Sequence, residues 1–204
     1  MPNRFVGTGE YWEQRYHKGG NSGGGSYGKH ADFKSRVLND FVDQHNIQSV
    51  IEFGCGDGNQ LSLADYPTYV GVDISPTAIE ICKSKFGTDP TKSFITLDEY
   101  NQDRTFDLSL SLDVLYHLIE DEIYYQYLDN LFGASSKFVS IFARDEDDPI
   151  DKWAPHVRCR KFSTDIQIRY NDFALVKHVP NEFPLTEQTP DGSFADFYFY
   201  EKAR

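Results

Sequence analysis

From residue 47 onward, short apolar runs alternate with amphipathic stretches. The apolar runs have the length and composition of buried strands and occupy residues 48–53, 69–73, 93–97, 107–111 and 137–143. Between them, residues 76–86 and 120–132 have the spacing of helices, and Ser75 followed by a proline is a typical helix start. This alternation predicts parallel strands joined by helical crossovers, which is an α/β sandwich.

The amino-terminal part contains a glycine-rich segment between two ordered stretches. Six of the ten residues 19–28 are glycine. Large aromatic residues precede this segment at residues 11–16, and an amphipathic helix follows it. The apolar face of that helix contains Phe33, Val37, Leu38, Phe41 and Val42. A glycine-rich run is often a flexible linker, but a run held between ordered elements is also a candidate lid over a ligand, and both interpretations stay open.

The carboxyl-terminal part has a third pattern. Residues 163–170 are expected to form a short helix, and residues 173–179 and 193–201 are expected to form two strands. Two consecutive strands without a helix between them favour an antiparallel hairpin at one edge of the sheet. Since no internal repeat or linker interrupts the chain, we expect a single domain over residues 1–204, with residues 1–30 as an aromatic and glycine-rich lid segment.

Composition and charge narrow the classes of function. The chain has 204 residues, with 32 Asp and Glu against 20 Lys and Arg, which gives a formal charge of −12. A surface this acidic repels phosphate groups, so nucleic acid and anionic membranes are not expected partners. Three scattered cysteines are too few for a disulfide framework or a zinc site, and we expect no metal. Without an apolar signal or membrane span, the sequence indicates a cytoplasmic protein.

A glycine-rich loop follows the first predicted strand. The sequence Glu52-Phe53-Gly54-Cys55-Gly56-Asp57-Gly58 places an acid in the strand end and three glycines after it, where the backbone can approach a ligand closely. The next strand ends in Asp73, a carboxylate that can accept from both hydroxyls of a ribose. The G-x-G-x-G spacing differs from the G-x-G-x-x-G of dinucleotide dehydrogenases, and residues 59–68 are too few for a long phosphate-binding helix. A nucleotide ligand without pyrophosphate is therefore predicted.

These motifs resemble those of class I S-adenosylmethionine-dependent methyltransferases. The loop with Glu52, Gly54 and Gly56 is similar to the family's first motif, whose backbone cradles the methionine end of the cofactor. Asp73 falls where the family binds the ribose hydroxyls, and Ile74 falls where an apolar side chain packs on adenine. The resemblance implies S-adenosylmethionine as the cofactor and S-adenosylhomocysteine as the product.

The resemblance extends over residues 49–143. Asp98 matches the position that accepts from the adenine amine, and residues 109–118 resemble the fourth-strand motif with its Val-Leu-x-His-Leu ending. It implies a Rossmann-like sheet of seven strands, mostly parallel with an antiparallel last strand, and helices on both faces. The helix after the glycine loop is unusually brief for the family. The cofactor-binding residues expected on this basis are Tyr11, Tyr27, Glu52, Gly54, Gly56, Asp73, Ile74, Asp98, Glu99 and Ser111.

Two residues after the fourth strand are candidates for catalysis. Methyl transfer from a sulfonium is an in-line displacement, so placement of the nucleophile contributes most of the catalysis. His117 is the candidate general base, since histidine titrates near neutrality, although a capping or packing role suits it equally well. Asp113 is ambiguous in the same way, because it suits the cofactor's amino group, a substrate amine or a structural bond.

The segment after the fifth predicted strand contains opposite charges close together. Residues 145–151 are acidic and typical of a solvated loop, whereas His156, Arg158 and Arg160 would point to one side of an extended chain. In the resembled fold the insertion 144–161 lies over the mouth of the site, so these three residues and Tyr116 are the expected substrate contacts. Arginine suits carboxylate or phosphate, which predicts an anionic substrate; neutralisation of the acidic loop is the alternative.

The leading functional prediction is methyl transfer to an oxygen or nitrogen of a small, anionic metabolite of the glycan-precursor or secondary-metabolite type. Methylation of amide or base nitrogens is set aside, because no Asn/Asp-Pro-Pro-aromatic motif follows the fourth strand. Methylation of pyrimidine carbon-5 is set aside as well, because no cysteine follows a proline. One alternative is methylation of protein or RNA, and the net charge opposes RNA. The other is a non-catalytic cofactor-binding partner subunit, which the intact glycine and ribose motifs oppose. The acceptor and the oligomeric state are left open.

Overall fold

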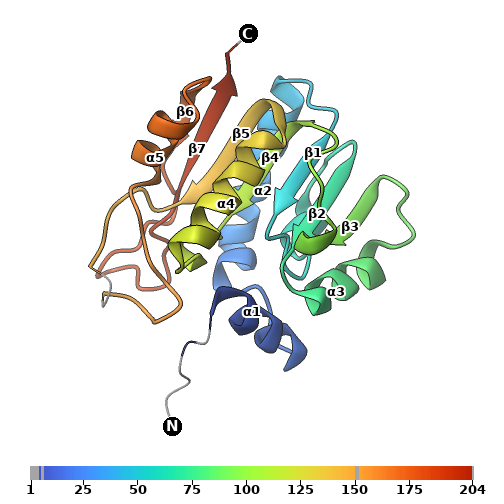
Figure 1. Ribbon diagram of the computed structural model, residues 1–204. Helices are drawn as coiled ribbons and strands as arrows, with labels where there is room; N and C mark the ends of the chain where they lie inside the picture. The colour runs from blue at the N-terminus through green and yellow to red at the C-terminus, as the bar shows by residue number, and fades with distance from the viewer. Residues whose placement is uncertain (1–4, 6, 150–151, 204) are drawn as a thin grey trace.

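A seven-stranded sheet forms the middle layer of the computed structural model, which describes residues 5, 7–149 and 152–203 (Figure 1). The strands are β1 (Val50–Phe53), β2 (Tyr69–Asp73), β3 (Lys92–Thr96), β4 (Phe106–Leu112), β5 (Ser135–Ala143), β6 (Phe173–Val179) and β7 (Asp196–Lys202). Their order across the sheet is β3-β2-β1-β4-β5-β7-β6. Strands β1 to β5 pair in parallel, and β7 lies antiparallel between β5 and β6. The expected Rossmann-like sheet with an antiparallel last strand is confirmed.

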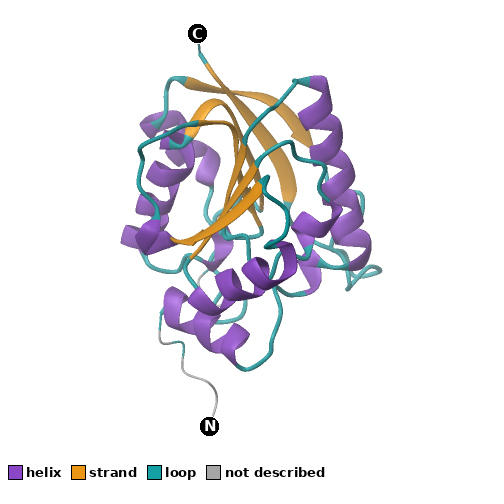
Figure 2. Ribbon diagram, turned by 90° about the vertical axis from the view of Figure 1, so that its right-hand side faces the viewer, coloured by secondary structure: helices purple, strands orange, loops and turns teal. Residues whose placement is uncertain are grey.

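Helices cover both faces of this sheet (Figure 2). On one face, α2 (Gly28–Gln44) and α3 (Pro76–Phe86) pack into one apolar core with the strands. On the other face, α4 (Asp121–Gly133) and α5 (Phe162–Arg169) pack into a second core. The remaining helix, α1 (Thr8–His17), is part of neither layer and crosses the end of the sheet (Figure 1).

The burial of the central strands follows from this layering. Every residue of β1 and of β2 is buried, because a parallel sheet covered on both faces leaves no solvated side for polar residues to alternate onto. The start of α3 agrees with the sequence, since the Ser75 hydroxyl accepts from the N–H of Ala78 and Pro76 opens the helix. Strand boundaries differ from the expected ones by at most three residues.

Two crossover connections contain only a short 3₁₀ turn. One is Gln60–Leu63 between β1 and β2, where the sequence indicated an unusually brief helix. The other is Leu97–Glu99 between β3 and β4. In place of longer helices, α1 and the glycine-rich segment after it cover the end of the sheet at which the parallel strands terminate.

Candidate active site

A cavity of about 410 Å³ lies where β1, β2 and β4 end. The strand order reverses between β1 and β4, and this point is the usual ligand crevice of an open α/β sheet. Helices α1, α2 and α4 complete its walls. Of the residues singled out in the sequence, those that line the cavity are Glu52, Gly54, Gly56, Asp73, Ile74, Asp113 and His117.

The glycine loop after β1 needs glycine at two positions. Gly54 and Gly56 have φ angles of +82° and +57°, a left-handed backbone that favours glycine. A Cβ atom at Gly56 would lie 2.3 Å from the hydroxyl oxygen of Ser22, and one at Gly54 would lie 2.5 Å from a methyl group of Val114. The loop therefore touches both the glycine-rich segment and the loop after β4, with no room for side chains.

Asp73 joins the end of β2 to the glycine loop. One of its carboxylate oxygens accepts from the N–H of Gly56 and the other from the N–H of Ser75, both over 2.9 Å. Burial raises the pKa of this carboxyl to about 6, although these backbone bonds favour its charged form. Since a carboxylate has about four acceptor positions, Asp73 retains capacity to accept from the two hydroxyls of a ribose.

A cluster of buried charges lies beside the loop. Lys34 on α2 has a fully buried side chain, and its Nζ lies 2.5 Å from Asp113 Oδ2. The other oxygen of Asp113 accepts from the hydroxyl of Tyr116 over 2.6 Å. Glu52 accepts from the hydroxyl of Tyr69 over 2.6 Å, and burial raises its pKa to about 7. Lys34 was missed from the sequence, yet a lysine on the apolar face of an amphipathic helix was the signal that could have found it.

His117 has one ring nitrogen fixed and the other available. Its Nδ1 lies 2.9 Å from the carbonyl oxygen of His156. Because a carbonyl only accepts, Nδ1 carries the hydrogen and Nε2 is the acceptor of the neutral ring. Burial lowers the pKa of this ring to about 4, so it is uncharged at neutral pH. In the part of the chain that the structure describes, Nε2 has no hydrogen-bond partner.

Helix α1 presents a different aromatic residue to the cavity from the expected one. Thr8, Trp12 and Tyr16 follow each other at four-residue spacing and line the cavity as one face of the helix. Tyr11 lies outside this face and stacks on the ring of His156, with ring centroids 4.5 Å apart. The structure therefore places Trp12 and Tyr16, and not Tyr11, in the wall of the cavity.

The glycine-rich segment is docked on the glycine loop. The N–H of Ser22 donates to Asp57 Oδ2 over 2.9 Å, and the N–H of Asp57 donates to Ser22 Oγ over 3.0 Å. Tyr27, an expected cofactor contact, instead donates its hydroxyl to Asp57 over 2.8 Å and is not among the cavity-lining residues. Ser22 and Ser26 line the cavity in its place.

Three other expected cofactor residues lie beside the cavity without lining it. Asp98 and Glu99 are exposed, and Glu99 accepts from the backbone N–H of Thr96 over 2.8 Å as the cap of its own turn. Ser111 is buried and accepts from the hydroxyl of Tyr127 over 2.8 Å. Leu97, one residue before Asp98, reaches the cavity instead.

The basic cluster of the insertion does not line the cavity. Arg158 and Arg160 donate to backbone carbonyls after β4 and pair with Asp121 on α4. The acidic loop has other cations, because Asp148 pairs with Arg144 and with Lys152. Neither expectation from the sequence, an anion site or neutralisation of the acidic loop, describes these arginines.

Across residues 5, 7–149 and 152–203, no three His, Cys, Asp or Glu side chains gather as ligands of a metal ion would. In the same ranges, no helix has both the length and the apolar character needed to cross a bilayer.

Comparisons with known proteins agree with this geometry. A family model described as a methyltransferase domain matches residues 51–135, which run from within β1 to the first residue of β5 and include the glycine loop. The N-methyltransferase NodS from Bradyrhizobium japonicum WM9, solved with S-adenosyl-L-homocysteine, has a TM-score of 0.70 at 17% identity, covering 97% of this chain and 99% of that one.

Two further solved structures have the same fold. Magnesium protoporphyrin IX methyltransferase from Synechocystis PCC 6803, solved with S-adenosyl-L-homocysteine, gives a TM-score of 0.67 at 14% identity and covers 95% of this chain and 97% of that one. The methyltransferase domain of a bacterial Hen1 protein gives a TM-score of 0.65 at 17% identity and covers 84% of this chain and 97% of that one. A comparison with curated proteins gave no match. Residues 51–135 thus match a methyltransferase domain, and the chain shares the fold of methyltransferases solved with S-adenosyl-L-homocysteine.

Proposed function

We propose that the protein transfers the methyl group of S-adenosylmethionine to an oxygen or nitrogen of a small metabolite, with His117 as the proton acceptor. The observation that carries this proposal is the orientation of the His117 ring, which lines the cavity and holds its hydrogen on Nδ1. Burial keeps the ring neutral at pH 7, so Nε2 has a lone pair available for a proton.

The bound cofactor supplies an electrophilic methyl carbon on a sulfonium. Asp73 would hold the ribose hydroxyls, Ile74 and Leu97 would contact the adenine, and the glycine loop would contact the methionine end. The cofactor would supply this methyl group to the acceptor's lone pair and would leave as S-adenosylhomocysteine, with the carbon–sulfur electron pair on sulfur. His117 Nε2 would take the proton that the hydroxyl or amine of the acceptor loses.

The cover over the site supports a small acceptor. Helix α1 and the glycine-rich segment close the cavity from above the strand ends, which favours a small molecule over a protein or RNA, and the net charge of −12 further opposes RNA. Five carboxyl groups, those of Glu52, Asp57, Asp73, Asp113 and Glu122, line the cavity with Lys34, which is paired. We therefore propose a neutral or cationic acceptor in place of the anionic one, within a metabolic pathway of the cytoplasm.

The acceptor class can be tested before the acceptor is known. The protein is incubated with S-adenosylmethionine tritiated on its methyl group and with cell extract separated by size into small molecules and macromolecules. The expected result is label transferred in the small-molecule fraction, lost in His117→Gln and retained in the control His178→Gln, which changes an exposed histidine on β6. Label in protein or RNA contradicts the proposal, and binding of cofactor without transfer to either fraction supports a non-catalytic subunit.

A further inference from the structure

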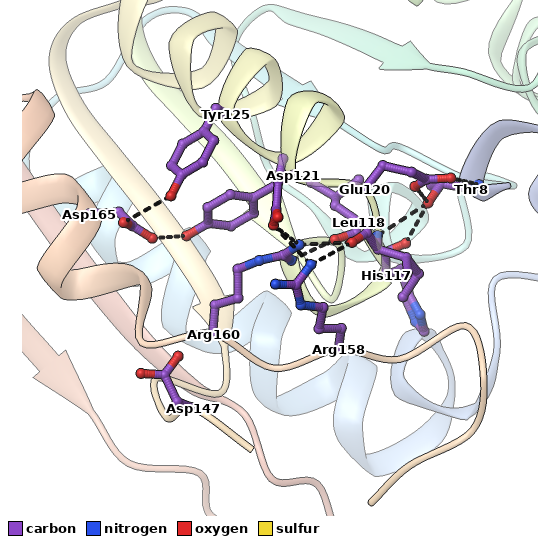
Figure 3. Close-up of polar contacts among 12 residues, drawn as sticks. Thr8, His117, Leu118, Glu120, Asp121, Tyr125, Asp147, Arg158, Arg160 and Asp165 are labelled. Carbon is purple, nitrogen blue, oxygen red and sulfur yellow. Dashed lines mark hydrogen bonds and ion pairs between the residues drawn. The ribbon is translucent and has the colours of Figure 1, made fainter. Parts of the chain in front are cut away.

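One segment of the insertion runs along the loop that bears His117. This loop, residues 116–121, is named here the His117 loop (Figure 3). The backbone N–H of Arg158 donates to the carbonyl of residue 116 over 2.8 Å. The guanidinium of Arg160 donates to the carbonyls of residues 118 and 119 over 2.6 and 2.9 Å, and that of Arg158 also donates to residue 119 over 2.9 Å. Irregular backbone that is partly buried needs such partners, and here they come from a distant segment.

The first residue of α1 contacts the same loop from another side. The hydroxyl of Thr8 lies 3.0 Å from the carbonyl oxygen of His117 and 2.6 Å from the Glu120 carboxylate. The N–H of Thr8 donates to the other oxygen of Glu120 over 3.1 Å. Four consecutive carbonyls, those of residues 116–119, therefore face donors from outside the loop.

The two arginines are committed to these contacts. The side chain of Arg160 is 9% exposed, stacks its guanidinium 4.4 Å above the ring of Tyr124 and lies 2.9 Å from Asp121 Oδ1. Arg158 lies 2.8 Å from the same carboxylate oxygen. A planar guanidinium can bridge two carbonyls and a carboxylate at once, which a lysine ammonium cannot do in the same geometry.

We propose that Arg158 and Arg160 are positioning residues, which hold the His117 loop so that the His117 ring faces the methyl donor, with Thr8 bracing the loop from α1. The inference rests on the proposed role of His117. The carbonyl that fixes the ring's hydrogen on Nδ1 belongs to His156, two residues before Arg158, so the same segment sets both the loop and the tautomer. Displacement of this segment would release loop and ring together.

The ring of His117 reports on this arrangement directly. Histidine-labelled protein is followed by NMR in the cofactor-free state across pH, with His117→Gln used to assign the signal. The groups that face the ring are His156 from the insertion, Asp113 from beside the loop and Arg15 from α1, and all are kept unchanged. In the wild type we expect hydrogen on Nδ1 and a midpoint near pH 4.

Arg160→Ala should move the midpoint up by about one pH unit or more and mix the two tautomers, because water reaches the released ring. The His117 midpoint of Arg160→Lys should lie between those of Arg160→Ala and the wild type. Arg144→Ala is the matched control, since Arg144 lies in the same insertion, pairs with Glu146 and Asp148 and should leave the ring unchanged. If Arg160→Ala does not fold, Asp121→Asn is measured in its place. This substitution lies on the surface and removes the carboxylate that Arg158 and Arg160 share.

An unchanged His117 midpoint and tautomer in folded Arg160→Ala and Asp121→Asn would overturn the proposed positioning role. A displaced ring in these variants, with the control unaffected, supports it. The methyl-transfer assay of His117→Gln tests the base by itself, so failure of the base and failure of the positioning role give different results.

Discussion

Single residues around the cavity show a conflict between binding and stability. Lys34 and Asp113 neutralise each other, whereas Glu52 is buried and, among the described residues, accepts a hydrogen bond only from the hydroxyl of Tyr69. Burial without an ion-pair partner penalises a carboxylate, which is why the pKa of Glu52 rises to about 7. Such a group is useful when a cationic ligand arrives, and it destabilises the protein while the cavity is empty.

Glu52→Gln should stabilise the cofactor-free protein at alkaline pH. The folded pKa of Glu52, about 7, lies above its ordinary value of 4.5, so its favourable contribution is present below pH 4.5 and is lost as the pH rises through 7. Glutamine keeps an acceptor for Tyr69 and carries no charge. We expect the free energy of unfolding to rise by about 1–3 kcal/mol at pH 8 and to be unchanged near pH 4.5, measured by urea denaturation at both values.

The same substitution should weaken binding of S-adenosylhomocysteine, measured by calorimetry at pH 8. Glu80→Gln, on α3 away from the cavity, is the control. It should change neither the free energy of unfolding nor the affinity for S-adenosylhomocysteine. A destabilised Glu52→Gln protein at pH 8 would contradict the assignment of a raised pKa.

At the scale of elements, the strands and helices were largely predictable from the sequence. Which side of an element points toward the cavity was not. Periodicity located the five parallel strands and the terminal hairpin because each strand's burial is recorded in its own residues. The aromatic run 11–16 indicated contact with the cavity, but without the helix phase it could not separate Tyr11 from Trp12 and Tyr16. One residue turns a helical side chain by about 100°, so an error of one position reverses its role.

The arginines of the insertion illustrate a second limit of prediction from the sequence. The acidic residues that precede them in sequence lie within residues 145–151, whereas their partner in space is Asp121, nearly forty positions earlier. Local charge patterns cannot reveal a pairing that depends on how two loops pass each other. The glycine-rich segment was ambiguous for a similar reason, since Asp57, on which it docks, lies in a different element.

The docked segment should act as a lid whose hinge contact is Asp57. Asp57 accepts from the N–H of Ser22 and from the hydroxyl of Tyr27, so Asp57→Ala removes the acceptor for both. A buried hydrogen bond to a charged group contributes about 1.5–3 kcal/mol, so amide exchange over residues 19–28 should accelerate about tenfold or more. Hydrogen exchange with mass spectrometry measures this directly.

In the wild type, S-adenosylhomocysteine should slow exchange over residues 19–28, and in Asp57→Ala this protection should be much reduced. The control Asp32→Ala removes an exposed carboxyl on α2 and should behave like the wild type. Equal exchange over residues 19–28 with and without the ligand would show the segment to be only a linker.

For the whole molecule, the cavity is where otherwise separate parts of the chain meet. Its lining draws on α1, the glycine-rich segment, α2, three parallel strands and α4, from both apolar cores. A ligand that fills it contacts all of these parts at once. Because the parts that line the cavity belong to one sheet and its two apolar cores, such a ligand should stabilise the entire fold and not only the lid.

S-adenosylhomocysteine should therefore raise the melting temperature of the protein as a single transition. A ligand present at one hundred times its dissociation constant adds about 2.7 kcal/mol to the free energy of unfolding, which for about 200 residues corresponds to roughly 5–10 °C. In Asp73→Ala the loss of the acceptor for the ribose hydroxyls should weaken binding by at least about tenfold, so the shift at the same concentration should fall to roughly half or less. Differential scanning calorimetry measures both proteins with and without the ligand, and Asp40→Ala, an exposed change on α2, is the control that should keep the full shift. An equal shift in Asp73→Ala and wild type would remove Asp73 from the nucleotide site, and two separate transitions would show that the lid and the sheet unfold independently.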